Sequence, residues 1–468
     1  MGKRVTILLL ALVLCHGASV AMEYTEGGER SERRGGKEGK KLFLLKESKH
    51  VVKTDAGEMR VVRSVEGPIH IGFITMEPQT LFIPQYLDSS LILFVHRGKA
   101  RIGCVYEDEV VELRLKMGDL YQIPAGSAFY MVNPAEGQRL HIICSIDESE
   151  SLGFGSFQSF FIGGGSYPTS ILFGFKLQTL STAFNVSKSV VMDILDRQQE
   201  GPIVYMNRTH TPSFWKKFIE LRETDRLQHL KKMVEARQES GQAEEEQTGW
   251  SWRELLNSFF GIKITGDGYK GTRKSPDSYN LYNRSPDFRN NYGWSIALDG
   301  SDYSALKHSG IGVYLVNLTA GSMMAPHLNP TATEYGIVLR GTGRIQIVFP
   351  NGTSAMDAKV TEGDVFWVPR YLAFCQIASR AGPFEFFGFT TSAHKNRPQF
   401  LVGANSLLHA LHGPELAAAF GTTEERIKRV LDGQREAVIL PSPVAIPTRR
   451  REEMMILETM EEEMIMGF

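Results

Sequence analysis

The sequence has few cysteines, almost no net charge and no basic stripe. Its 468 residues include four cysteines, Cys15, Cys104, Cys144 and Cys375. Thiols this few and this far apart do not form a disulfide framework, even in an oxidising compartment. The 52 basic and 53 acidic residues nearly cancel, which argues against a nucleic-acid partner. No Ser/His/Asp pattern and no phosphate-binding loop is evident, so these classes of enzyme are disfavoured.

Long apolar runs are also missing. Lys3-Arg4, the apolar run Val5–Leu14 and the small residues Ser19–Ala21 have the order of a secretory signal peptide, which we place at residues 1–21. The apolar run is about half the length that a bilayer requires, so a membrane anchor is disfavoured. We predict that the mature chain is soluble, has no membrane partner and passes through the secretory pathway.

Asn-x-Ser/Thr sequons are relevant to a chain that enters this pathway. The sequence contains five, and Pro286 after the Asn283 sequon makes us rank that one lowest. The remaining glycosylation candidates are Asn185, Asn207, Asn317 and Asn351.

Short β segments separated by tight turns fill the stretch from Gly321 to Gln376. Tyr335–Leu339 and Arg344–Phe349 are rich in branched and aromatic residues and are bounded by glycine or proline. Pro350-Asn351-Gly352 favours a hairpin turn, and Gly363-Asp364 precedes a further strand. The pattern is typical of an all-β unit.

This unit occurs twice in the chain. Four pairs of segments match in the same order: Phe94–Ile102 with Ile337–Ile345, Gly118–Pro124 with Gly363–Pro369, Leu180–Phe184 with Leu416–Phe420, and Leu195–Gln198 with Leu431–Gln434. Such order over strands and helices is difficult to obtain by chance. We predict two β-barrels, each followed by a small helical arm.

The remaining segments divide the chain around this duplication. Apolar residues at helical spacing among dense charges predict a helical linker between the barrels. The predicted divisions are a signal peptide (1–21), a charged disordered arm (22–41), the first barrel with its arm (42–211), the charged helical linker (212–262), the second barrel with its arm (263–440) and a flexible tail (441–468).

The stretch from Gly321 to Gln376 resembles the two signature motifs of the cupin family. That family has two histidines, a glutamate and a turn glycine in its first motif, and Gly-Asp, a proline and a last histidine in its second. The corresponding residues here are His327, Asn329, Glu334, Gly341, Gly363, Asp364, Pro369 and Phe374. Asparagine and phenylalanine therefore replace two of the three histidines, and the metal site of the family is incomplete.

Residues Ser285–Trp294 and Asn280-Leu281 resemble the start of the C-terminal cupin in vicilin-type (7S) seed globulins. The resemblance implies a bicupin of two jelly-roll barrels and a homotrimer assembled through the helical extensions. The apolar positions that would be covered are Ile171, Leu172, Phe173, Phe175, Leu177, Phe184, Leu195, Phe400, Leu401, Leu407, Leu408, Leu411 and Phe420.

The residues at the positions of the cupin metal ligands indicate which chemistry this chain can perform. The first barrel has Pro84 or Gln85, Tyr86 or Leu87, Leu91, and Phe129 there, which is no ligand set. The second retains only His327 and Glu334, so we expect no metal, no cofactor and no catalytic residue. A pocket for a small carboxylate or similar polar ligand remains open, in which His327, Asn329, Glu334 and Gln376 converge in an otherwise aromatic cavity with Tyr335 and Phe374.

Three functions follow in order of preference. The first is a non-enzymatic seed storage globulin, a nutrient reservoir in the protein storage vacuole, with an extracellular destination as the alternative. The second is a small-ligand binding protein that uses the cavity of the second barrel. The third is a metal-dependent cupin enzyme, such as an oxalate decarboxylase or a superoxide dismutase-like protein.

Overall fold

The computed structural model describes residues 42–64, 69–106, 109–149, 151, 157–206, 278–394 and 397–441. The predicted signal peptide, charged arm, helical linker and all of the tail after residue 441 lie outside these ranges, as does Asn207. Within them, no helix is long and apolar enough to cross a bilayer.

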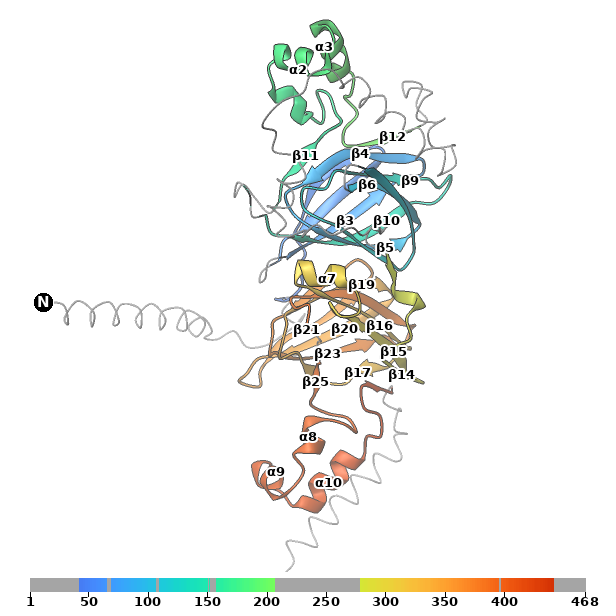
Figure 1. Ribbon diagram of the computed structural model, residues 1–468. Coiled ribbons are helices and arrows are strands. Elements are labelled where there is room, and N and C mark those ends of the chain that lie inside the picture. Colours follow the sequence, from blue (N-terminus) through green and yellow to red (C-terminus); the bar gives the residue numbers. More distant parts are fainter. Residues whose placement is uncertain are drawn as a thin grey trace, which may run out of the picture. The chain divides into compact units, whose positions relative to one another are not determined.

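Two antiparallel sheets form the first barrel (Figure 1). The first sheet has the order β1 (Ser48–Thr54), β2 (Gly57–Val62), β3 (Ile69–Met76), β10 (Leu140–Asp147), β5 (Leu91–Arg97), β8 (Asp119–Ile123), β13 (Tyr279–Asn280). The second has the order β11 (Ser159–Phe161), β4 (Thr80–Leu87), β9 (Phe129–Asn133), β6 (Lys99–Tyr106), β7 (Glu109–Lys116), and β12 (Ile203–Tyr205) pairs with β4. Alternating apolar side chains of both sheets fill the space between them.

The second barrel repeats this arrangement. One sheet has the order β14 (Phe288–Asn290), β15 (Gly293–Leu298), β16 (Gly312–Leu318), β24 (Phe384–Thr390), β19 (Glu334–Arg340), β22 (Val365–Val368). The other has the order β21 (Ser354–Thr361), β20 (Thr342–Val348), β23 (Ala373–Ala378), β17 (Met323–Met324), β26 (Ile439–Leu440), with β18 (His327–Leu328) on β23 and β25 (Gln399–Phe400) on β18. The short helix α7 (Ser304–Ser309) connects β15 to β16.

A small helical arm follows each barrel. The first contains η1 (Ile171–Gly174), α2 (Leu177–Phe184) and α3 (Lys188–Asp196), and the second contains α8 (Leu407–Ala410), α9 (Pro414–Ala419) and α10 (Glu424–Asp432). A further single turn, η2 (Leu281–Asn283), precedes β14. Local signals define these ends: Pro414 opens α9, and the Thr423 hydroxyl accepts a hydrogen bond from the Arg426 amide at the start of α10.

Equivalent turns show how closely the two halves correspond. Gly98 and Gly341 each join two matching strands, with φ of 90° and 83°. A Cβ at these positions would lie 2.8 Å from the Arg139 carbonyl oxygen and 2.0 Å from that of Pro383. Both turns therefore require glycine, and the predicted duplication is confirmed.

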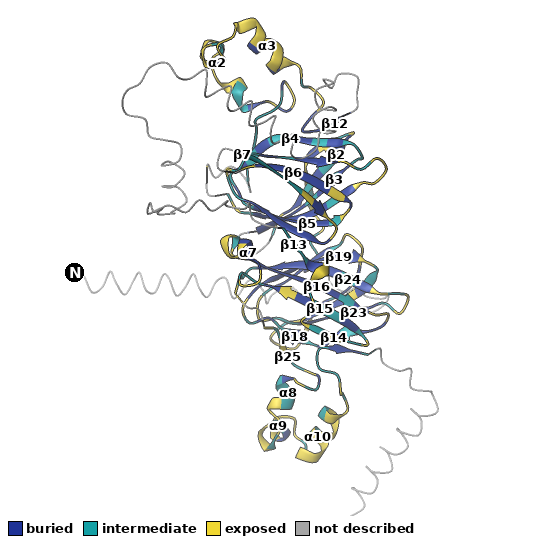
Figure 2. Ribbon diagram, turned by 45° about the vertical axis from the view of Figure 1, so that its right-hand side comes forward, coloured by how far each residue is buried: buried dark blue, intermediate teal, exposed yellow. Residues whose placement is uncertain are grey.

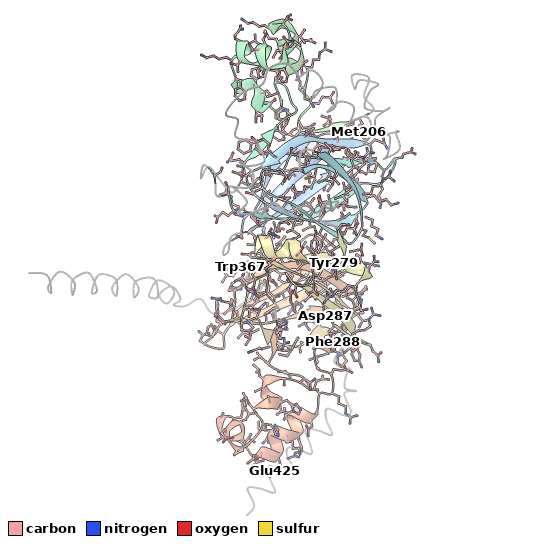
Figure 3. All side chains as sticks on the ribbon, in the orientation of Figure 1. Met206, Tyr279, Asp287, Phe288, Trp367 and Glu425 are labelled. Carbon is pink, nitrogen blue, oxygen red and sulfur yellow. The ribbon has the colours of Figure 1, made fainter. Side chains whose placement is uncertain are left out.

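The two barrels exchange short segments. The Trp367 amide donates to the Phe43 carbonyl at 3.0 Å, so the start of the described chain pairs with β22 of the second barrel (Trp367 is labelled in Figure 3). In return, β13 pairs with β8 of the first barrel, with Tyr279 opposite Leu120. By hydrogen bonding, the segment at Phe43 therefore belongs to the second barrel and β13 belongs to the first. The predicted divisions at 42–211 and 263–440 placed each segment in the opposite barrel.

Aromatic stacking and one ion pair join the barrels elsewhere. The rings of Phe94 on β5 and Phe387 on β24 stack with centroids 4.0 Å apart, and both side chains are fully buried. Arg97 pairs with Glu362 at 2.6 Å, but both side chains are about half exposed, so this pair contributes little. Burial of the phenylalanines is the main source of stability at this contact.

We predict that Phe94→Ala lowers the free energy of unfolding by about 3–5 kcal/mol, because the smaller side chain leaves a cavity at the contact. Urea unfolding of the full chain measures the change. Val51→Ala, at a 41% exposed position on β1, is the control and should cost no more than about 0.5 kcal/mol. Equal effects of both variants would contradict this account of the contact.

Candidate functional site

His327 lies on the short strand β18, between two aromatic side chains. Its ring is 4.1 Å from that of Phe374 on β23 and 5.2 Å from that of Phe400 on β25, measured between centroids. The side chain is buried, and Nδ1 lies 2.7 Å from the Ala325 carbonyl oxygen. Since a carbonyl only accepts, Nδ1 carries the proton. Burial lowers the pKa of His327 to about 4, so the imidazole is neutral.

Both polar atoms of the Asn329 side chain form hydrogen bonds within the protein. Its Oδ1 accepts hydrogen bonds from the amides of Thr331 and Ala332 and from the Thr331 hydroxyl, each at 3.0 Å. Its Nδ2 donates to Glu334 Oε1 at 2.8 Å. Where the cupin motif has a histidine, this chain therefore has an amide that shapes the loop before β19.

Glu334 is the buried acid of the cluster. Desolvation raises its pKa to about 7, although the hydrogen bond from Asn329 works in the opposite direction. Tyr314 on β16 lies on the same face of the sheet, and burial together with the charge of Glu334 raises the pKa of its hydroxyl well above the usual value. Among the described residues, that hydroxyl has no hydrogen-bond partner.

Sequence reasoning did not identify Tyr314. The signal available was glycine on the neighbouring strand: Gly388 is opposite Tyr314, and a Cβ there would lie 2.2 Å from the tyrosine ring. The missing side chain provides the space that this ring occupies inside the second barrel.

Phe374 and Gln376 share one face of β23, whereas Cys375 points away from it. Cys375 is opposite Gln346, and its Sγ lies 3.6 Å from Oε1 of that side chain. Gln376 is buried, and its Oε1 has no partner among the described residues. The Cys375 thiol therefore lies on the other face of β23 from Phe374, which occupies the ligand histidine position.

Tyr335 must be removed from the predicted pocket lining. It follows Glu334 directly in β19, and successive strand residues point to opposite faces. Its register partner Phe389 belongs to the face that contains Phe387 and contacts the first barrel. Tyr335 is next to Glu334 in the sequence, but its side chain lies on the other face of β19.

The first barrel has no histidine or carboxylate at the equivalent positions. Gln85 is opposite Phe129, as His327 is opposite Phe374, which resolves the alternatives in favour of Gln85 and, two residues later, Leu87. With Leu91 at the glutamate position, this set cannot bind a transition metal. Among the described residues of both barrels, no group of three or more His, Cys, Asp or Glu side chains is placed to bind a metal ion.

The three cysteines in the described ranges are free thiols and are buried. The glycosylation candidates differ in their setting. Asn185 and Asn351 are exposed, and Asn317 on β16 is partly exposed. Their use as glycosylation sites stays a prediction.

The two buried titratable groups should have opposite effects on stability. The folded-state pKa of Glu334 is raised, so its contribution falls as pH rises from 4.5 to about 7. The pKa of His327 is lowered, so its contribution rises with pH from about 4 to 6.5. Each slope is at most about 1.4 kcal/mol per pH unit.

We predict that Glu334→Gln makes the stability increase with pH between 4.5 and 6.5, relative to the unmodified chain, because the histidine contribution is then unopposed. His327→Gln should make it decrease over the same range. Urea unfolding of the full chain across this range measures both slopes. Parallel profiles for the two variants would show that these groups do not titrate as described.

Comparison with known proteins agrees with this geometry. Residues 43–159 and 279–428 match the family described as Cupin. A vicilin-like seed storage protein of Arabidopsis thaliana is 56% identical over 424 residues, which cover 88% of this chain and 82% of the relative. A vicilin of Corylus avellana is 24% identical, over 89% of this chain and 87% of that protein.

Solved structures show the shared bicupin fold. The crystal structure of vicilin from Corylus avellana matches with a TM-score of 0.68 at 21% identity, covering 86% of this chain and 99% of that one. A vicilin from Solanum melongena matches with a TM-score of 0.68 at 18% identity, covering 86% and 98%. The two matched segments and the 56% identical relative show that this chain belongs to the cupin family and, within it, to the vicilin-like seed storage proteins, or 7S globulins.

Proposed function

We propose that this protein is a seed storage globulin without enzymatic activity. The storage role is supported by its vicilin-like relatives. The proposal that the protein is not an enzyme rests on the cupin motif. Asn329 is hydrogen-bonded to backbone amides and to Glu334, and the ring of Phe374 packs against that of His327. A catalytic metal centre needs converging ligands and an open coordination position, and these contacts use the ligand positions for packing instead.

We further propose that three copies assemble through the helical arms. Figure 2 shows that the arms are mostly exposed, whereas the barrel strands are mostly buried. On the first arm, Phe173, Phe175 and Phe184 are 53%, 57% and 51% exposed. On the second, Leu411 and Phe420 are each 61% exposed. Apolar area of this size on a soluble chain indicates a covered surface.

The first arm also has a cleft that another arm could fill. Its volume is about 500 Å³, and Phe173, Phe175 and Met192 are among its lining residues. Because the two arms of one chain carry different apolar surfaces, contact between the first arm of one copy and the second arm of the next is head-to-tail. Head-to-tail contacts form a ring when the rotation between copies closes, and a ring of three is the proposed assembly.

The proposed destination is the protein storage vacuole, reached through the secretory pathway, and the extracellular space is the alternative. A compact trimer with buried thiols and buried strands resists premature proteolysis, which a store must do until it is mobilised.

We predict that Leu411→Asp combined with Phe420→Asp shifts the purified protein from trimer to monomer, because two buried charges at the contact have no partner. Native mass spectrometry measures the subunit number. Val51→Asp, an exposed apolar position on β1, is the control and should remain trimeric. A monomeric unmodified chain would refute the assembly.

We also predict that the protein accumulates in maturing seed and contains well below one transition-metal ion per chain, because the motif lacks a ligand set. Quantitative immunoblotting through development and elemental analysis of the purified protein provide the measurements. Stoichiometric manganese or copper, lost on His327→Ala, would revive the metal-dependent enzyme and overturn the proposal.

A second candidate function is binding of a small carboxylate within the second barrel. It is favoured by two buried polar groups, the Tyr314 hydroxyl and Gln376 Oε1, which have no partner among the described residues. The Solanum melongena vicilin structure is described as revealing different anionic ligands in structurally similar pockets. Retention of a small acid in native mass spectra, lost on Tyr314→Phe, would favour this candidate over storage alone.

A further inference from the structure

Two histidines and two ion pairs lie at the end of the contact between the barrels where β5 ends. Arg97 on β5 pairs with Glu362, in the turn between β21 and β22 of the second barrel, at 2.6 Å. His141 on β10 is opposite Arg97 in the strand ladder. Two residues before it, Arg139 pairs with Glu77 at 2.8 Å. The arginines and the acids are thus already matched before either histidine carries a charge.

The first of the two histidines, His96, directly precedes Arg97 on β5. It is left out of the ladder between β5 and β10, as Leu339 is left out of the ladder between β19 and β24. Its Nδ1 is buried and has no hydrogen-bond partner among the described residues. Burial and the neighbouring charges of Arg97 and His141 lower the pKa of His96 to about 4. The imidazole is therefore neutral in neutral solution.

The second histidine, His141, is half-buried opposite the same arginine. Burial is the main cause that lowers its pKa, and the charges of Arg97 and Arg139 act in the same direction. Glu77 and Glu362 act in the opposite direction, but each carboxylate already pairs with one of the two arginines. Protonation of His141 therefore adds a charge that has no acid of its own.

The second barrel shows that the fold requires neither histidine. Leu339 is at the position of His96, and Glu385, opposite Arg340, is at the position of His141. The second barrel therefore has an acid opposite its arginine. The equivalent arginine of the first barrel has a histidine opposite it and takes its acid from the other barrel.

We propose that His96 and His141 make the contact between the two barrels sensitive to acid. In neutral solution both imidazoles are neutral and the contact is closed. In mildly acidic solution the two added charges lie beside two arginines in a partly buried place, where like charges repel each other. Loosening of the contact at this end returns both imidazoles to water and relieves the repulsion.

The direction of the pH dependence follows from how each histidine binds its proton. A histidine with a lowered pKa binds the proton more readily once the contact is open, so acid favours the open state. Each histidine raises the opening constant by at most about tenfold per pH unit below its ordinary pKa of 6.5. For His96 this rise continues to about pH 4. Above pH 6.5 the contact keeps its full stability.

A thiol placed at the contact measures its opening. Ile143 on β10 is opposite Phe94 and is buried with the residues of the contact, whereas the next residue, Cys144, is fully buried inside the first barrel. The full chain with Ile143→Cys is labelled with 4,4′-dithiodipyridine, and peptide mass spectrometry reports both positions relative to a free thiol at the same pH. We expect labelling at position 143 to increase by about tenfold or more between pH 7 and pH 5, while Cys144 stays unlabelled.

Replacement of the histidines in this background tests their role. His96→Leu combined with His141→Gln removes both titrating groups, and labelling at position 143 should then change by less than about threefold over the same range. His141→Gln alone, at a half-buried position, should reduce the increase severalfold and does not depend on folding of the double variant. His412→Leu, at an exposed position on the second arm, is the matched control and should keep the full increase.

Three results would overturn the proposal. The first is a labelling rate at position 143 that does not change between pH 7 and pH 5. The second is an equal increase in the variants that lack one or both histidines. The third is equal labelling of Cys144, which would show that acid unfolds the first barrel instead of loosening its contact with the second.

Discussion

The structure depends on a sheet that is buried on both of its faces. Strand β24 contributes Phe384 and Phe386 to the interior of the second barrel, and Phe387 and Phe389 to the opposite face, where Phe387 stacks on Phe94 of the first barrel. All four side chains are fully buried. A strand buried on one face alternates apolar and polar residues, whereas β24 has phenylalanines on both of its faces. Contact between the barrels is therefore part of each barrel's core, and the exchanged segments around Phe43 and Tyr279 reinforce it.

Given this shared scaffold, the two halves differ chiefly in where they place polar groups. The second barrel retains a buried cluster of Glu334, Asn329 and Tyr314 inside, and compensates its outer arginine with Asp357. The first barrel has Gln85, Leu87, Leu91 and Phe129 at the equivalent interior positions, all of them buried. Duplication produced two copies of one fold, and substitution at a few polar positions gave them different surfaces and interiors without altering strand register.

Much of the fold could be predicted from residues that require a particular local backbone conformation. The glycines at 98 and 341, the Gly-Asp turns and the matched helical segments each require a particular backbone, so their recurrence predicted two equivalent barrels with helical arms. The candidate site was predicted only in part. Asn329 and Glu334 do bond to each other, and Phe374 does lie against His327. Tyr335 was misplaced, because its side of the strand depends on the pleat, and Tyr314 was missed, because it is distant in sequence and faces Glu334 only across β24.

The sequence by itself determined the family, the duplication and the loss of two metal-ligand histidines, because motifs and turn residues act over a few neighbouring positions. Only the tertiary structure decided which barrel each short segment joins and which side chains share an interior. These features depend on strand register and on packing between residues far apart in the chain, and such pairings leave no local pattern to read.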